Sequence, residues 1–125
     1  MLFRSCYACE MFFDNVERMA KTGIAYTPLP KYPYSSRDIA ILVDEDVPAA
    51  GMEKEIERAA GEILESVKLF DVYRGEQVES GKKSLAFNLI YRDAEKTLTD
   101  KEVDEVHEKV VLALKYKFNA ILREI

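Results

Sequence analysis

The 125-residue chain is 48% hydrophobic with a formal net charge of −5, which indicates one compact globular domain and argues against a disordered chain. No stretch approaches the roughly 18 to 20 apolar residues of a membrane span, and the first residues turn polar too soon for a signal peptide. With only Cys6 and Cys9, we expect a reducing, cytoplasmic setting and no membrane association.

The first part of the chain predicts an extension in front of the compact domain. Tyr7–Phe13 is rich in aromatic residues and predicts a strand, and Asp14–Lys21 predicts a short helix. Three prolines and Gly23 follow, and proline removes backbone donors, so this stretch is expected to be a linker. We therefore divide the chain into an extension over 1–31 and a domain over 32–125.

The domain is predicted to open with a strand and a helix. Ile39–Val43 is a continuous apolar run that predicts the first strand, and Pro48 suits the start of a helix. Apolar residues at helical spacing then form one stripe, made of Met52, Ile56, Ala59, Ala60, Ile63, Leu64 and Val67. Gly61 inside this helix suggests close packing against a strand.

A hairpin, a capped helix and a last strand are expected next. Val67–Tyr73 and Ser84–Tyr91 predict two strands joined by a long polar loop. Thr99 with Glu102 forms a capping-box signature. The helix that it opens carries one apolar face, consisting of Val103, Val106, Val110 and Leu114, with Phe118 as a further candidate. Ala120–Arg123 predicts the final strand.

This order of elements, β-α-β-β-α-β, predicts the ferredoxin-like class of α+β fold: a four-stranded antiparallel sheet with both helices on one face. Residues 68–92 hold five bases against three acids, whereas 51–66 hold five acids against two bases and 93–109 seven against three. Because the two acidic segments are the helices, we expect an acidic helical side and a more basic sheet side.

Several segments in this order resemble the ferredoxin-fold anticodon-binding domain, which ends the β subunit of bacterial phenylalanyl-tRNA synthetase. They are Leu29–Pro48, Leu69–Gly75, Gly81–Arg92, Thr97–Val103 and the ending Lys117–Ile125, where Asn119 stands at a position in which glycine is common. Cys6–Val16 resembles the strand and helix that precede that domain. The resemblance covers most of the chain and suggests a piece excised from a longer subunit.

The resemblance implies a function. The sheet would bind the anticodon region of the tRNA for phenylalanine, and the fragment would have neither catalysis nor a cofactor of its own. ATP and magnesium would bind in the α subunit, which carries out aminoacylation within an α2β2 heterotetramer. Ferredoxin-like domains serve many functions, however. A structural or assembly module and a small-molecule regulatory domain of the ACT type remain alternatives.

The candidate RNA-binding residues are basic, aromatic or hydroxyl- and amide-bearing side chains in or beside the strands. They are Arg37, Tyr73, Arg74, Lys82, Lys83, Ser84, Asn88, Arg92 and Arg123. Guanidinium and ammonium groups suit phosphates, aromatic rings stack on bases, and an amide reads a base edge. Among the aromatic residues of the two hairpin strands, Tyr73 is our choice for exposure because it ends its strand.

Each candidate also has a structural interpretation. Arg37 suits a pair with Asp38 or another carboxylate, and Arg74 and Arg92 suit pairs with Asp71 and Asp93. The two lysines suit a solvated turn, and the asparagine suits a hydrogen bond within the sheet. An apolar open face would favour the assembly module, whereas a polar, arginine-bearing face would count against it.

The remaining reactive residues predict no catalytic or metal site. Cys6 and Cys9 form a C-x-x-C pair, but a structural zinc site usually needs four ligands and the single histidine is distant in sequence. We interpret both cysteines as ordinary strand residues. His107 is expected to lie at the surface or to pack at an edge.

Overall fold

A computed structural model gives the structure of the chain and describes residues 5–123. Its elements in chain order are α1 (Phe13–Met19), β1 (Ser35–Asp44), α2 (Ala49–Ala60), the short 3-10 helix η1 (Gly61–Ile63), β2 (Leu64–Tyr73), β3 (Lys82–Tyr91), α3 (Asp100–Phe118) and β4 (Ile121–Arg123).

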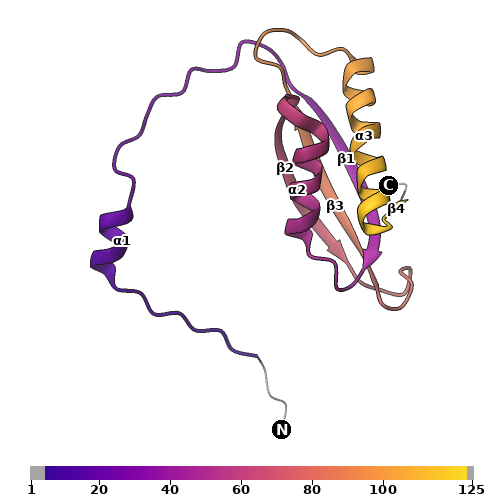
Figure 1. The fold of residues 1–125 in the computed structure, drawn as a ribbon, viewed down its shortest axis with the longest axis horizontal. Coiled ribbons are helices and arrows are strands. Elements are labelled where there is room, and N and C mark those ends of the chain that lie inside the picture. Colours follow the sequence, from indigo (N-terminus) through magenta and orange to yellow (C-terminus); the bar gives the residue numbers. More distant parts are fainter. Residues whose placement is uncertain (1–4, 124–125) are drawn as a thin grey trace.

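The four strands form one antiparallel sheet in the order β2-β3-β1-β4. Helices α2 and α3 lie side by side on the same face of this sheet (Figure 1). Both observations confirm the predicted ferredoxin-like α+β fold. The opposite face carries no helix, and we call it the open face.

The core lies between the helices and the sheet because side chains alternate along each strand. The odd-numbered apolar residues of β1 and β3 point toward the helices and are buried there, as Ile41 and Phe87 illustrate. The helices contribute Met52 and Ile56 from α2 and Val103, Val110 and Leu114 from α3. The apolar face predicted for α3 is thereby confirmed, with Val106 and Phe118 half-buried at its margin.

Helix α2 is shorter than its apolar stripe predicted. It ends at Ala60, and Gly61 follows with a φ of 71°, a backbone conformation that glycine adopts without strain. A Cβ placed on Gly61 would meet nothing within 4 Å, so the predicted close packing against a strand is wrong. The apolar stripe predicted from the sequence extends beyond Gly61 because Leu64 and Val67, which belong to β2, pack on the same core.

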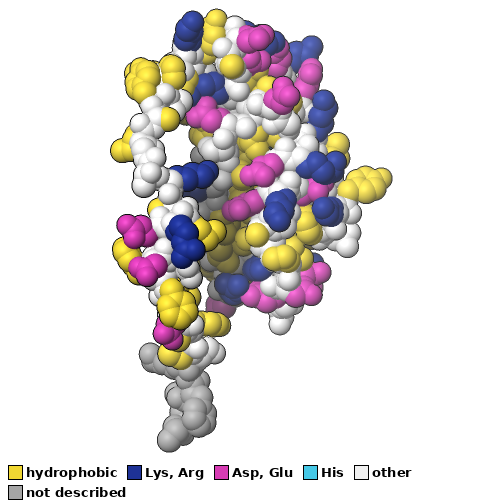
Figure 2. All heavy atoms as spheres, turned by 60° about the vertical axis from the view of Figure 1, so that its left-hand side comes forward, with side chains coloured by type: hydrophobic (Ala, Val, Ile, Leu, Met, Phe, Trp, Pro, Cys, Tyr) yellow, Lys and Arg dark blue, Asp and Glu magenta, His cyan; other side chains and the backbone are white. Residues whose placement is uncertain are grey.

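The amino-terminal segment differs from the prediction in one element. The strand predicted over Tyr7–Phe13 is wrong, because the described part of this stretch pairs with no other strand. Aromatic residues favour strands by packing on a sheet, and no sheet lies beside them here. The predicted short helix is confirmed as α1. This segment lies away from the sheet (Figure 1) and carries exposed hydrophobic side chains (Figure 2).

Helix α3 is fixed at both ends by its own sequence. The backbone N–H of Glu102 donates to Thr99 Oγ1 at 3.3 Å, and the backbone N–H of Thr99 donates to Glu102 Oε2 at 2.9 Å, which confirms the capping box. At the other end Asn119 adopts a left-handed conformation with a φ of 51°. Asparagine tolerates this conformation better than most residues, which explains its occurrence where glycine is common.

Candidate nucleic-acid interface

The open face combines polar side chains with apolar ones. The strand register places Asp38 and Lys68 on either side of Asn88, and it places Ala40 opposite Ala86 and Arg123. Ser36, Ser66, Asp71, Tyr73 and Ser84 complete its polar set. Larger apolar residues share this face: Leu42, Phe70, Ile90 and Ile121, of which Phe70 and Ile121 are each 52% exposed. The face is therefore mixed, with an arginine and polar groups that suit a polar partner beside exposed apolar groups.

A hollow of about 380 Å³ lies at one end of this face, where Tyr73 and Arg123 flank it. The Arg123 guanidinium carbon is 5.7 Å from the centre of the Tyr73 ring, and its Nη2 donates to Gln77 Oε1 at 3.3 Å. The remaining lining residues are Ala40, Phe70, Asp71, Ser84 and Ala86. Ala40 and Ala86 leave space for the hollow, because larger side chains at these central positions would fill it.

The hollow suits a planar ligand with polar edges. Aromatic and guanidinium planes both stack on nucleobases, and Tyr73 is 38% exposed. Asp71, Gln77 and Ser84 line the same space, and their side chains carry hydrogen-bonding groups that suit a base edge. The hollow thus brings together three residues predicted from the sequence: Tyr73, Ser84 and Arg123.

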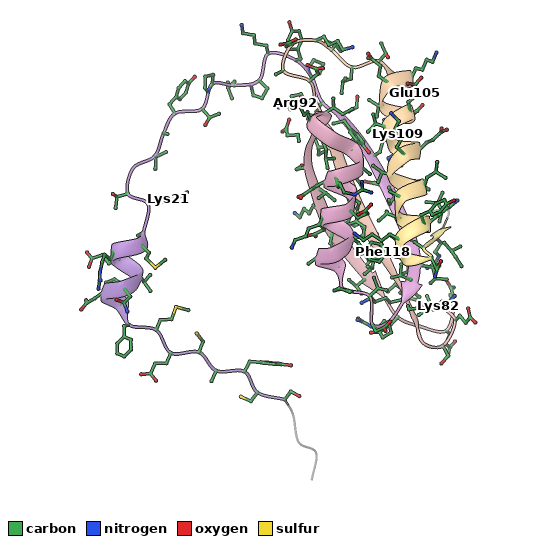
Figure 3. All side chains as sticks on the ribbon, viewed as in Figure 1. Lys21, Lys82, Arg92, Glu105, Lys109 and Phe118 are labelled. Atoms are coloured by element: carbon green, nitrogen blue, oxygen red, sulfur yellow. The ribbon has the colours of Figure 1, made fainter. Side chains whose placement is uncertain are left out.

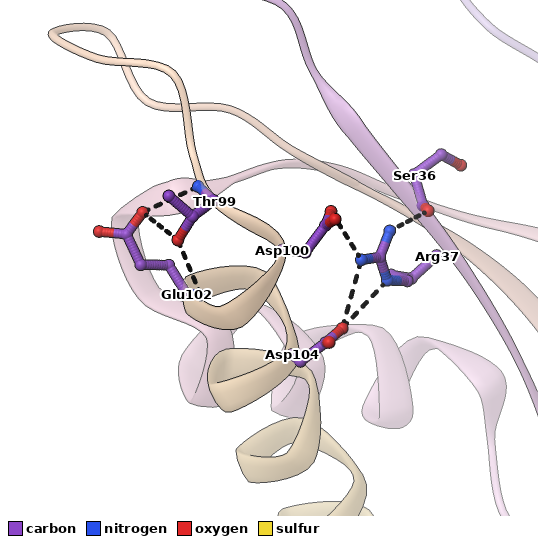
Figure 4. Close-up of polar contacts among 6 residues, drawn as sticks. All are labelled: Ser36, Arg37, Thr99, Asp100, Glu102 and Asp104. Atoms are coloured by element: carbon purple, nitrogen blue, oxygen red, sulfur yellow. Dashed lines mark hydrogen bonds and ion pairs between the residues drawn. The ribbon is translucent and has the colours of Figure 1, made fainter.

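Arg37 lies on the covered side of the sheet, away from this hollow. Its Nε and Nη2 donate to Asp104 Oδ1 at 3.3 and 3.2 Å, and its Nη2 lies 3.6 Å from Asp100 (Figure 4). Both carboxylates belong to α3. This arrangement matches the structural interpretation of Arg37, a pair with a carboxylate other than Asp38.

Three of the other basic candidates pair with glutamates at the ends of the sheet. Arg74 bonds Glu45 at 2.6 Å and Lys82 bonds Glu79 at 3.3 Å. At the opposite end of the sheet (Figure 3), Arg92 bonds Glu65 at 3.0 Å and lies 5.5 Å from the centre of the Tyr34 ring. The partners proposed from the sequence, Asp71 and Asp93, are therefore wrong.

Lys83 is buried on the covered side, where its strand position pairs with Val43. The sheet side was expected to be more basic than the helical side, and the strands of the open face carry no excess of bases. The bases of the hairpin are largely neutralised by these glutamates, and on the strands of the open face Lys68 and Arg123 balance Asp38 and Asp71. Acidic and basic side chains are interspersed over the surface visible in Figure 2.

Asn88 lies at the centre of the open face, where the sequence suggested an amide that reads a base edge or bonds within the sheet. Its Nδ2 donates to Ser36 Oγ at 2.8 Å and to Asp38 Oδ1 at 2.6 Å. Both neighbours are exposed. The hydrogen bond within the sheet is therefore present, and the amide remains beside solvent.

His107 packs against a buried tyrosine. Its Nδ1 lies 3.1 Å from the Tyr91 hydroxyl, and the two rings meet edge to face. Burial raises the pKa of Tyr91 to about 12. Burial, and secondarily the charge of Arg37, lowers the pKa of His107. These shifts keep both groups neutral at pH 7, which suits packing.

The described residues show neither a metal site nor a membrane helix. Within residues 5–123 no three His, Cys, Asp or Glu side chains gather closely enough to hold an ion. Cys6 and Cys9 are exposed and unpaired with each other. No helix in the same range is long and apolar enough to cross a membrane.

Three residues of the hollow were missed from the sequence. Phe70 is 52% exposed because a register shift between Leu69 and Asp71 turns it outward, and no sequence pattern marks that irregularity. Of the other aromatic residues in the hairpin strands, Phe87 and Tyr91 are buried. Tyr73 is exposed as predicted, but Phe70 is more exposed than Tyr73. Asp71 and Gln77 reach the hollow from positions that looked like a strand interior and a loop.

Comparison with known proteins adds an independent observation. The model of a family described as the ferredoxin-fold anticodon binding domain matches residues 30–123. A phenylalanine–tRNA ligase beta subunit of Halalkalibacterium halodurans is 46% identical over 120 residues, which is 96% of this chain and 15% of that protein.

Two further relatives carry the same name. That of Clostridium acetobutylicum is 46% identical over 118 residues, 94% of this chain and 15% of that protein. That of Bacillus cereus is 48% identical over 99 residues, 79% of this chain and 12% of that protein. The chain thus spans only about 15% of the length of the first relatives.

Proposed function

Because this chain belongs to the family of ferredoxin-fold anticodon-binding domains, we propose that its open face binds the anticodon loop of the tRNA for phenylalanine. The family makes the chain a binding domain and not a catalytic one. It also separates the chain from regulatory domains of the ACT type. The function follows from the site as well as from the family, because fold alone does not fix function.

The observation that carries the proposal is the hollow between Tyr73 and Arg123. An unstacked loop base finds there an aromatic ring, a guanidinium plane and polar atoms at its edges. Stacking on such a platform contributes about 1–3 kcal/mol per base. Single-stranded loops are the parts of an RNA that offer bases in this way.

Electrostatics supply a smaller part of the binding. The open face carries as many acids as bases on its strands, so few phosphates are neutralised. For about two phosphate contacts, from Lys68 and a residue such as Lys82, the logarithm of the binding constant falls with a slope of about −1.4 against the logarithm of salt concentration. The proposal therefore predicts shallow salt dependence and base-specific recognition.

The wider setting follows from the named relatives. We place the chain in a phenylalanine–tRNA ligase beta subunit that works in the cytoplasm with an α subunit, as an α2β2 heterotetramer. ATP and magnesium belong in this proposal to the α subunit. The role of this chain is then to select the tRNA.

Binding of the 125-residue chain to anticodon stem-loops tests this function. The cognate stem-loop should bind more tightly than an unrelated one at two salt concentrations, and Arg123→Ala should remove most of the difference. Arg18→Ala, on α1 and away from the sheet, serves as the matched arginine control. Equal affinities for the two stem-loops, with the chain folded, would reject recognition by this domain.

One observation favours an additional assembly role for the amino-terminal segment. Ile24, Tyr26 and Leu29 are more than four-fifths exposed, and the aromatic residues of α1 and its flank are exposed as well. Exposed apolar groups of this kind mark protein contacts. Deleting residues 1–29 should leave the unfolding temperature of the domain unchanged; a large decrease would show that the segment stabilises the domain itself.

A further inference from the structure

Asn88 is held in one orientation by two neighbours on β1. An amide nitrogen carries two N–H donors, and both are used here, on Ser36 Oγ and Asp38 Oδ1. The carboxylate of Asp38 only accepts hydrogen bonds, so the amide cannot turn its oxygen toward that side. Asn88 therefore presents its carbonyl oxygen, an acceptor, to a ligand on the open face.

Asn88, Ser36 and Asp38 form a cluster on the open face, and its β1 residues are held in place by contacts on the covered side of the sheet. Strand β4 pairs only with positions 40–42 of β1, so Ser36 and Asp38 lie where β1 has a strand neighbour on one side alone. Arg37, between them, points to the other face: its Nη1 donates to the Ser36 carbonyl at 3.1 Å while its other nitrogens bond Asp104 of α3 (Figure 4). The capped end of α3 thus anchors the part of β1 that orients Asn88.

The cluster lies next to the hollow. Ala86, which lines the hollow, and Asn88 are successive residues of β3 on the same face. Such residues are about 7 Å apart, a distance that a neighbouring nucleotide of an extended loop can span. Lys68, exposed on the far side of Asn88, lies where it can contact a phosphate.

We propose that Asn88, oriented by Ser36 and Asp38, is a specificity-determining residue that reads the exocyclic amino group of a base next to the one in the hollow. This inference rests on the proposed function and deepens it. The amide oxygen and the exposed Asp38 carboxylate are both acceptors, so they favour a base edge that donates. Adenine, cytosine and guanine carry amino groups, whereas uracil presents a single N–H between two carbonyls.

Removing the amino group from the RNA and the amide from the protein tests this contact. The 125-residue chain is titrated with stem-loops in which one loop nucleoside at a time is replaced by an analogue without its exocyclic amino group: purine riboside for adenosine, inosine for guanosine and pyrimidin-2-one riboside for cytidine. One replacement should weaken binding about fivefold to tenfold, the effect of one hydrogen bond at a desolvated site. In Asn88→Ala the same replacement should cause no further loss, because interacting groups are not additive.

Two other variants and a thermal scan complete the design. Asn15→Ala, on α1 and away from the sheet, should behave as the unaltered chain. Ser36→Ala removes one of the two bonds to the amide and should give an intermediate loss with an unchanged unfolding temperature. It tests the same orientation if Asn88→Ala proves too unstable to measure.

The possible failures are distinguishable. If the stem-loop binds but no replacement matters, or the loss persists in both Asn88→Ala and Ser36→Ala, the inference about Asn88 is overturned while the proposed function stands. If the folded chain binds neither the cognate stem-loop nor its variants, the proposed function is overturned and this inference falls with it.

Discussion

The two faces of β3 illustrate how one strand serves two purposes. Leu85, Phe87 and Leu89 are at most 1% exposed and pack under α2 and α3. Ala86 and Asn88, which alternate with them, lie on the open face and contact neither helix. Because alternate side chains point to opposite faces, stability and recognition depend on different residues, and substitutions should separate the two properties.

The largest expected effect is a loss of stability from the covered face. Phe87→Ala removes a fully buried ring and should lower the free energy of unfolding by about 3–5 kcal/mol. Asn88→Ala, one position further on, removes two partly exposed hydrogen bonds and should lower it by only about 1 kcal/mol. Denaturant unfolding of the two variants measures both values, and similar losses would contradict the division of the strand into two faces.

The next largest effect should appear in binding alone. Tyr73→Ala removes the ring that flanks the hollow and should weaken the cognate stem-loop about fivefold to hundredfold, corresponding to about 1–3 kcal/mol. Its unfolding temperature should change little because the ring is partly exposed. Tyr73→Phe keeps the stacking surface and should retain most of the affinity. Equal losses in both variants would show that the hydroxyl, and not the ring, is recognised.

A third prediction concerns charge on the covered side. Glu55 on α2 is buried, and Lys117 of α3 donates to its Oε2 at 2.9 Å. Hydrogen bonds from Arg58 and then from Lys117 lower the pKa of Glu55 from 4.5 to about 2. A carboxyl whose pKa is lowered by folding stabilises the protein above its unfolded pKa, and that contribution is lost as pH falls from 4.5 toward 2.

Unfolding at pH 7 and pH 3 measures this contribution. Glu55→Gln should reduce the difference in stability between the two pH values, because the substituted side chain does not titrate. Glu57→Gln, an exposed glutamate of the same helix, is the control and should leave the difference unchanged. Binding at pH 7, well above the affected range, should differ little between the control and the unaltered chain. A pH dependence unaltered in Glu55→Gln would contradict the pairing.

The smallest effect is expected at the hairpin end of the sheet. Lys82 bonds Glu79 at 3.3 Å, and partly exposed pairs of this kind stabilise a fold by about 0–1 kcal/mol. As a phosphate contact, Lys82→Ala should weaken cognate and unrelated stem-loops alike, about twofold to fivefold, and reduce the salt slope by about 0.7. A loss confined to the cognate stem-loop would instead assign base recognition to this lysine.

The same comparison shows what could be predicted from the sequence. The apolar run of β1, the helical spacing of α3 and the capping box at Thr99 are local patterns, and each appears in the structure as predicted. The end of α2 was misplaced because Gly61 lies within an apolar stripe that two elements share. The amino-terminal strand was mispredicted because aromatic residues favour a strand only where a sheet covers them.

The candidate site depended on information that no local pattern contains. Arg37 and Lys83 looked as suitable for RNA as Arg123, but the face on which each lies follows from strand register. Phe70 is exposed by an irregularity in the pairing of β2 with β3. The glutamates that neutralise Arg74 and Arg92 come from elements distant in sequence. Residue type therefore gave the kind of contact, and register decided which residues share a face.

The most direct test of the account is an NMR titration of the ¹⁵N-labelled 125-residue chain with the cognate anticodon stem-loop. The account predicts that the perturbed backbone amides cluster on the open face, at Ala40, Tyr73, Ala86, Asn88 and Arg123, with those in the middle of α2 and α3 unchanged. Perturbations confined to the outer surfaces of the two helices would contradict it, because the RNA would then bind the opposite side of the domain.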